Sequence, residues 1–195
     1  MPRTFFFKTP FFTYLAKFLL AFLFCYYGTL VIVGVCAPGG YYSSFIDHYF
    51  NYVKWLRATI MYTCEYALSL VGYKTYLQNP YLLKLQGGLG VHIVYSCLGI
   101  GVMSFWGAFV FANERAWIQK LKWIIGGWII IWSINVTRIV LLILATNKGW
   151  VAPFNLDHHT LFNIAAYTAI FILIYFFDRS GRDKPITKQP GDIAY

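Results

Sequence analysis

The sequence predicts an all-α integral membrane protein, a helical bundle of about four transmembrane helices with an additional interfacial or re-entrant helical region. Apolar residues make up 59% of the 195 residues, aromatic residues 21% and charged residues only 12%, which is typical of membrane proteins. The apolar residues gather in runs of roughly 20 residues, about the length that crosses a bilayer. The charged residues lie mainly between these runs.

The first predicted span covers residues 11–36 and ends before the helix-breaking sequence Pro38-Gly39-Gly40. This run is too long for the core of a typical signal peptide, so we expect a retained span. Residues 41–95 form an extracytoplasmic and interfacial region that begins with many aromatic side chains, as membrane interfaces favour. Within it, residues 55–72 have a helical pattern, but Arg57 and Glu65 leave open whether they cross the membrane, re-enter it or lie flat.

After Lys74 the chain becomes polar and glycine-rich, and Gly87-Gly88-Leu89-Gly90 predicts a loop leading into an extended segment that reaches Cys97. Three further spans are predicted, followed by a polar cytoplasmic tail over residues 178–195. These spans cover residues 97–112, 123–145 and 160–177. With no linker or repeat in the sequence, we expect one membrane domain over residues 1–195.

The distribution of basic residues favours a topology in which residues 55–72 do not cross the membrane. Cytoplasmic segments are enriched in Lys and Arg. In the four-span topology ten basic residues are cytoplasmic and five are outside, whereas a crossing at 55–72 leaves six inside and nine outside. The four-span topology places both termini in the cytoplasm.

This topology brings three dispersed polar residues to similar depth near the outer membrane face. Cys97 opens the second span, Arg138 lies about eight residues before the end of the third, roughly 12 Å from it, and His159 precedes the fourth. The long Arg138 side chain can reach toward the interface. We therefore expect a thiol, a guanidinium and an imidazole to meet at the extracytoplasmic surface.

Such a set can supply a nucleophile, an anion stabiliser and a proton carrier. A nearby cation and a place in the first turn of a helix both favour a Cys97 thiolate. A charge within a span is costly and usually faces a partner or a site, which applies to Arg138. Asn135 lies one turn away on the same face, so a polar pocket wall is expected there. His158 and Asp157 are alternatives or supports for His159.

Each of these residues also has a purely structural interpretation. Cys97 is then a core cysteine, Arg138 an anchor that reaches the interface, and the histidines a solvated helix cap. A metal site formed by His92, Asp157, His158 and His159 lacks any recognised spacing, and we expect neither a metal nor a cofactor. The cysteines at positions 25, 36, 64 and 97 contain no CxxC pair. The net charge of +9 arises from Lys and Arg residues in short loops and tails between the apolar runs, as orientation signals do. Nucleic-acid binding is therefore not expected.

Three short segments resemble the exosortase/archaeosortase family of membrane cysteine transpeptidases. They are Ser96-Cys97-Leu98-Gly99, Asn135-Val136-Thr137-Arg138-Ile139 and Asp157-His158-His159. In order, spacing and topology the resemblance extends from about residue 80 to 177. It implies cleavage of a C-terminal sorting signal on exported proteins, which consists of a short motif, a transmembrane helix and a basic tail.

The resemblance implies Cys97 as nucleophile, Arg138 as thiolate or oxyanion stabiliser and His159 as general acid and base. His159 is chosen over His158 because a small residue follows the family's His by four positions, and Asn163 stands there. Leu98 and Asn163 replace a common Ser and the usual Gly, which suggests a divergent exosortase branch. The resemblance also implies transfer of the cleaved protein to an acceptor at the cell membrane, whose identity it leaves open between a lipid and a polysaccharide.

One alternative from another class is a non-catalytic assembly or export component that binds lipid-linked or polysaccharide-linked phosphate through Arg138. That function requires Arg138 but not Cys97. A small transporter is a third possibility, weakened by the shortage of ionisable residues within the spans.

Overall fold

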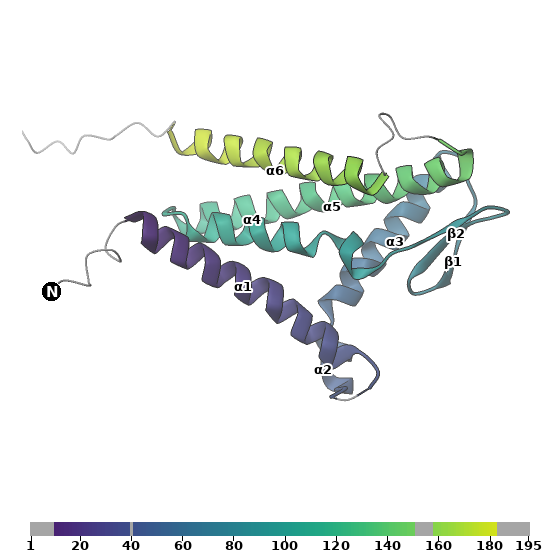
Figure 1. Ribbon diagram of the computed structural model, residues 1–195, viewed down its shortest axis with the longest axis horizontal. Helices are drawn as coiled ribbons and strands as arrows, with labels where there is room; N and C mark the ends of the chain where they lie inside the picture. Colours follow the sequence, from purple (N-terminus) through teal and green to yellow (C-terminus); the bar gives the residue numbers. More distant parts are fainter. Residues whose placement is uncertain (1–9, 40, 151–157, 183–195) are drawn as a thin grey trace, which may run out of the picture.

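A computed structural model describes residues 10–39, 41–150 and 158–182. Six α-helices and a small sheet make up these parts of the chain (Figure 1). The helices are α1 (Pro10–Cys36), α2 (Ser44–Tyr49), α3 (Tyr52–Leu70), α4 (Ile100–Ala112), α5 (Trp117–Lys148) and α6 (His158–Arg182). A 3-10 helix, η2 (Tyr95–Leu98), precedes α4.

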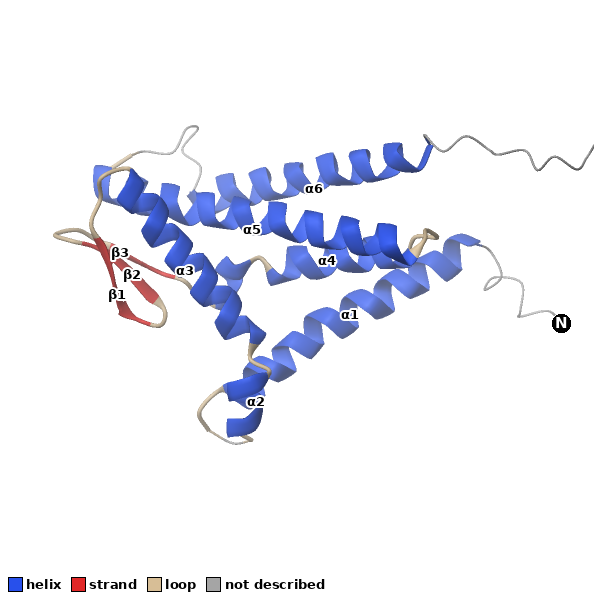
Figure 2. Ribbon diagram, turned by 180° about the vertical axis from the view of Figure 1, so that it is seen from behind, coloured by secondary structure: helices blue, strands red, loops and turns tan. Residues whose placement is uncertain are grey.

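Helices α1, α4, α5 and α6 form an elongated bundle with consecutive long helices running in opposite directions (Figure 1). One end of this bundle holds the start of α1, the α4–α5 connection and the end of α6. The opposite end, called the sheet end here, holds η2, the β-sheet and the start of α6 (Figure 2). Helix α3 crosses the bundle obliquely near the sheet end instead of running along it.

The all-α prediction was wrong in one respect, because residues 75–92 form a three-stranded antiparallel sheet. Its strands are β1 (Thr75–Asn79), β2 (Leu82–Leu85) and β3 (Gly90–His92), in the order β1-β2-β3. Alternate residues of a strand face opposite sides, and in β2 the buried residues are Leu83 and Leu85. The sequence analysis predicted an extended segment only in the region of β3. It missed β1 and β2, because this short hairpin contains no long apolar run.

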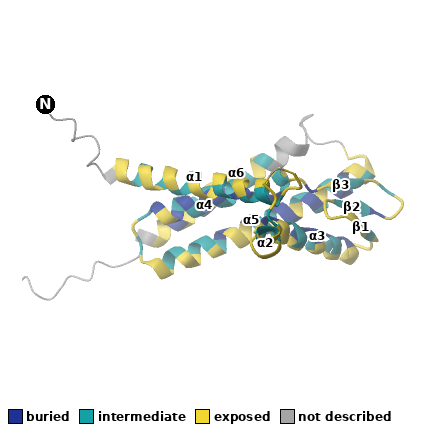
Figure 3. Ribbon diagram, turned by 90° about the horizontal axis from the view of Figure 1, so that it is seen from below, coloured by how far each residue is buried: buried dark blue, intermediate teal, exposed yellow. Residues whose placement is uncertain are grey.

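Two helices in the described residues are long and apolar enough to cross a membrane, Phe11–Cys36 and Trp117–Lys148. Helix α4 has 13 residues and measures about 20 Å, which is short of the roughly 30 Å hydrocarbon core. Many side chains of α1 are exposed (Figure 3), whereas Phe18 and Phe22 pack against Phe105 of α4, as in a helix at the edge of a membrane bundle.

Two apolar clusters hold the helices together. At the sheet end, α3, the sheet, η2 and the last turns of α5 bury a cluster that includes Ile60, Leu68, Leu83, Leu98 and Ile143. Nearer the opposite end, α4, α5 and α6 bury a cluster of Trp106, Val110, Ile131, Ile170, Leu173 and Phe177. The first cluster fixes the position of η2 against α5, which determines the geometry of the site.

Candidate active site

Cys97 lies in the 3-10 turn η2 and not in a regular helix. Its backbone N–H donates to the carbonyl oxygen of Val94 at 2.9 Å, and its half-buried side chain packs against the sheet-end cluster. Gly99 follows in the left-handed conformation, with φ of +71°, and α4 begins at Ile100. The prediction that Cys97 occupies the first turn of the span was therefore wrong, because the left-handed residue separates η2 from α4.

The turn that carries Cys97 is attached to α5 through Asn135. The Nδ2 of Asn135 donates to the carbonyl oxygen of Leu98 at 3.3 Å, and this side chain is only 6% exposed. A Cβ added to Gly99 would lie 2.1 Å from the same Nδ2. The close approach therefore requires glycine at position 99, both for its positive φ and for the space that the amide occupies.

A second asparagine attaches the preceding segment to the end of α5. The Oδ1 of Asn147 accepts from the Leu89 N–H at 2.7 Å, and its Nδ2 donates to the Leu89 carbonyl oxygen at 3.3 Å. The chain from Leu89 to Leu98 is thus attached at both ends to α5, over 12 helical residues or about 18 Å. Cys97 lies near the Asn135 end of this segment.

Arg138 lies between the two asparagines on α5, one helical turn beyond Asn135 toward the sheet end. Three residues correspond to a rise of about 4.5 Å on the same face of the helix. Arg138 is half-buried. The buried position of Asn135 corrects one prediction, because this residue supports the Cys97 turn from within the core instead of lining a polar wall.

The start of α6 lies at the sheet end, as the predicted topology requires of the histidines (Figure 1). His158 and His159 are the first two residues of α6. The structure does not describe the side chains of these two histidines, nor Asp157. The predicted supporting contacts of these residues therefore lie outside its described part.

The sequence analysis assigned no site role to two further polar residues, Arg57 of α3 and Tyr95 of η2. The Arg57 guanidinium lies 4.4 Å from the centre of the Tyr81 ring, and its Nε is buried without a hydrogen-bond partner among the described residues. The Tyr95 hydroxyl is likewise buried and lacks such a partner within the described ranges. Burial raises the pKa of Tyr95, and the nearby phenols of Tyr26 and Tyr52 raise it further.

The other three cysteines differ from Cys97 in their surroundings. Cys25 and Cys36 belong to α1, and Cys64 of α3 is fully buried with its Sγ 3.7 Å from the Val136 carbonyl oxygen. All four cysteines are free thiols. Among the described residues, only Cys97 has its thiol in the turn that Asn135 attaches to the Arg138 helix.

Comparison with known protein families shows the family of this chain. The model of the transmembrane exosortases, of EpsH type, matches residues 14–176. The chain belongs to the exosortase family. The match includes α1 and α3 as well as the three segments that carry the resemblance, so it extends well into the first half of the chain. No curated protein and no solved structure gives a significant match.

Membership makes this exosortase a transmembrane protein and relates it to enzymes that act on exported proteins with C-terminal sorting signals. The family is one of cysteine transpeptidases.

Proposed function

We propose that this exosortase is a membrane cysteine protease and transpeptidase whose site comprises Cys97, Arg138 and His159 at the extracytoplasmic face. The observation that carries the proposal is the hydrogen bond from Asn135 to the Leu98 carbonyl oxygen. It holds the turn containing Cys97 against α5, one helical turn from Arg138.

The proposed topology has four spans, α1, α4, α5 and α6, with both termini in the cytoplasm. Its support is the charge distribution, ten basic residues against five, and the oblique course of α3 (Figure 1). The sheet end is then extracytoplasmic, where exported substrates arrive. Helix α4 is short, but η2 directly precedes it and extends the same segment toward the sheet end. The short helix is therefore compatible with this topology.

The reaction is an acyl transfer in two halves. His159 takes the proton of the Cys97 thiol, and the resulting thiolate attacks the carbonyl carbon of the scissile peptide. The tetrahedral intermediate collapses with cleavage of the C–N bond, and His159 delivers its proton to the leaving amine. The transmembrane helix and basic tail of the substrate leave with that amine.

In the second half, an acceptor nucleophile attacks the Cys97 thioester and gives up its proton to His159. That proton returns to the sulfur when the C–S bond breaks, which regenerates the free thiol. Water in place of the acceptor gives simple proteolysis. Arg138 stabilises the negative charge on the sulfur or on the tetrahedral oxygen.

Mass spectrometry of a tail-bearing exported protein, co-expressed with this exosortase or its Cys97→Ala variant, tests the proposal. We expect a shortened substrate only with Cys97, and any mass added at the new C-terminus identifies the acceptor. Cys64→Ala provides the control, because this buried thiol has no proposed chemical role. Equal processing by the wild type and Cys97→Ala would exclude the mechanism.

The assembly-component alternative makes the opposite prediction. In that case Cys97→Ala leaves the cellular phenotype unchanged, whereas Arg138→Ala abolishes it. Comparing these two variants in one assay of substrate processing and one of protein export separates the two functions.

A further inference from the structure

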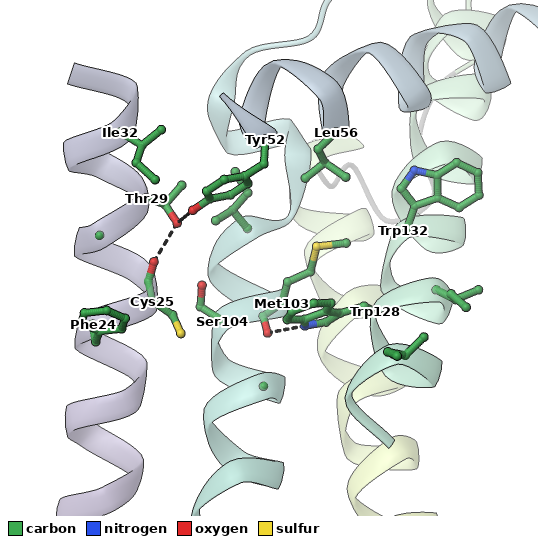
Figure 4. A pocket seen from close by; sticks show the side chains of 15 residues that line it. Phe24, Cys25, Thr29, Ile32, Tyr52, Leu56, Met103, Ser104, Trp128 and Trp132 are labelled. Carbon is green, nitrogen blue, oxygen red and sulfur yellow. Dashed lines mark hydrogen bonds between the residues drawn. The ribbon is translucent and has the colours of Figure 1, made fainter. Parts of the chain in front are cut away.

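An apolar groove lies between α1 and α5, with α4 as its floor (Figure 4). Its volume is about 910 Å³. At the sheet end it is bounded by Tyr52 and Leu56 of α3, and the Tyr52 hydroxyl forms a hydrogen bond with Thr29 of α1. Ile100, the first residue of α4, also lines it, so the groove ends within three residues of Cys97.

The lining residues follow helical spacing on every wall. Helix α4 contributes positions 100, 103, 104 and 107, and α5 contributes positions 125, 128, 129 and 132. Each set is an i, i+3, i+4, i+7 stripe, the pattern that a helix presents to another helix.

Several of the residues that line the groove are small. Cys25, Gly28 and Thr29 of α1 and Ser104 and Gly107 of α4 line the groove. In membranes, helix association depends on such residues because they allow close backbone contact. A flexible acyl chain has no backbone that requires this approach, so the small residues favour a helix as the occupant.

The walls of the groove are held in place by hydrogen bonds. The Nε1 of Trp128 donates to the Met103 carbonyl oxygen at 3.0 Å, and the Nε1 of Trp132 lies 3.3 Å from the Thr59 hydroxyl. The first bond ties α5 to α4 and the second ties α5 to α3. The groove is therefore preformed, as binding sites usually are.

We propose that this groove binds the transmembrane helix of the substrate. The inference rests on the proposed function.

Photo-crosslinking in the Cys97→Ala background tests the groove without requiring cleavage. Benzoylphenylalanine replaces Phe24, which lines the groove, or Tyr27, an exposed aromatic residue of the same helix outside it. The probe is an exported protein that ends in an apolar helix and a basic tail. A control probe carries a lipidated cysteine anchor in place of that helix.

We expect crosslinks to the helical probe at least several times stronger from position 24 than from position 27, and their loss with the lipidated anchor. Equal crosslinking from both positions, or crosslinking of phospholipid alone at position 24, overturns the proposal. If crosslinking is specific but wild-type enzyme cleaves nothing, docking stands and the transpeptidase mechanism fails. If cleavage occurs without specific crosslinking, docking alone fails.

A matched pair of glycine variants gives a second test in the active enzyme. An added Cβ at Gly28 or at Gly34 meets no atom within 4 Å, but only Gly28 lines the groove. Gly28→Leu fills the groove and should lower processing about tenfold or more, whereas Gly34→Leu should match wild type. Equal processing by both variants contradicts the proposal.

Discussion

Asn135 and Gly99 occupy adjoining space: the amide nitrogen of Asn135 lies where a side chain at position 99 would begin, 2.1 Å from an added Cβ. The same amide donates to the Leu98 carbonyl oxygen. This hydrogen bond joins two residues that are 37 positions apart in sequence. The position of α5 therefore directly determines the position of the turn that carries Cys97.

Gly99→Ala should abolish processing, because the added Cβ displaces Asn135 and also occupies a left-handed position at a cost of about 1–3 kcal/mol. Gly87→Ala is the control for backbone strain, since Gly87 has φ of +76° with no atom within 4 Å of an added Cβ. Processing and detergent-solubilised thermal stability are measured for both variants. Equal defects in the two would show that strain alone, and not the contact with Asn135, is responsible.

Arg138→Lys should reduce processing by about 10²-fold or more, the cost of removing a donor that stabilises a developing anion. A lysine ammonium keeps the charge but lacks the planar guanidinium fork. Initial rates of product formation, measured at equal enzyme levels in membranes, check this expectation. The neighbouring exposed Thr137, whose hydroxyl bonds to the Ser133 carbonyl oxygen of its own helix, supplies the control variant Thr137→Ala. A fully active Arg138→Lys enzyme would reduce Arg138 to a membrane anchor.

His159→Ala should lower the rate by about 10²–10⁴-fold, the usual contribution of general acid–base catalysis. His158→Ala should retain most of the activity. Rates of both variants are measured from pH 5 to pH 8, where an imidazole titrates. The reverse order of the two defects assigns proton transfer to His158 instead.

Asn147→Ala should loosen the segment before Cys97, because both hydrogen bonds to Leu89 are lost. A net loss of about 1 kcal/mol or somewhat more is expected for such bonds. Hydrogen–deuterium exchange should accelerate in peptides covering residues 86–96 and remain unchanged in α1. Unaltered exchange would mean that the sheet, and not Asn147, holds this segment.

Cys97 should react with a membrane-impermeant maleimide from the extracytoplasmic side, whereas Cys64 should not. Cys97 is half-buried in the turn at the sheet end, and Cys64 is fully buried. Single-cysteine variants in intact cells and in inverted vesicles separate the two faces of the membrane. Labelling of Cys97 only in inverted vesicles would reverse the proposed topology.

The apolar runs of the sequence were enough to predict long helices in the regions of α1, α5 and α6, because their length and composition exceed what a soluble loop or strand requires. The helical pattern of residues 55–72 likewise predicted most of α3. The alternation of basic segments predicted which ends of the helices lie together. The motif around Cys97 and that around Arg138 were sufficient to indicate the family.

Only the tertiary structure decided how Cys97 is positioned. The sheet of residues 75–92, the left-handed Gly99 between η2 and α4, and the attachments by Asn135 and Asn147 all depend on contacts between distant segments. Such contacts leave little periodic signal in a sequence, because a single buried amide can satisfy them. Local composition therefore determined which segments are helical and which residues are chemically capable, while packing of remote segments determined where the thiol lies.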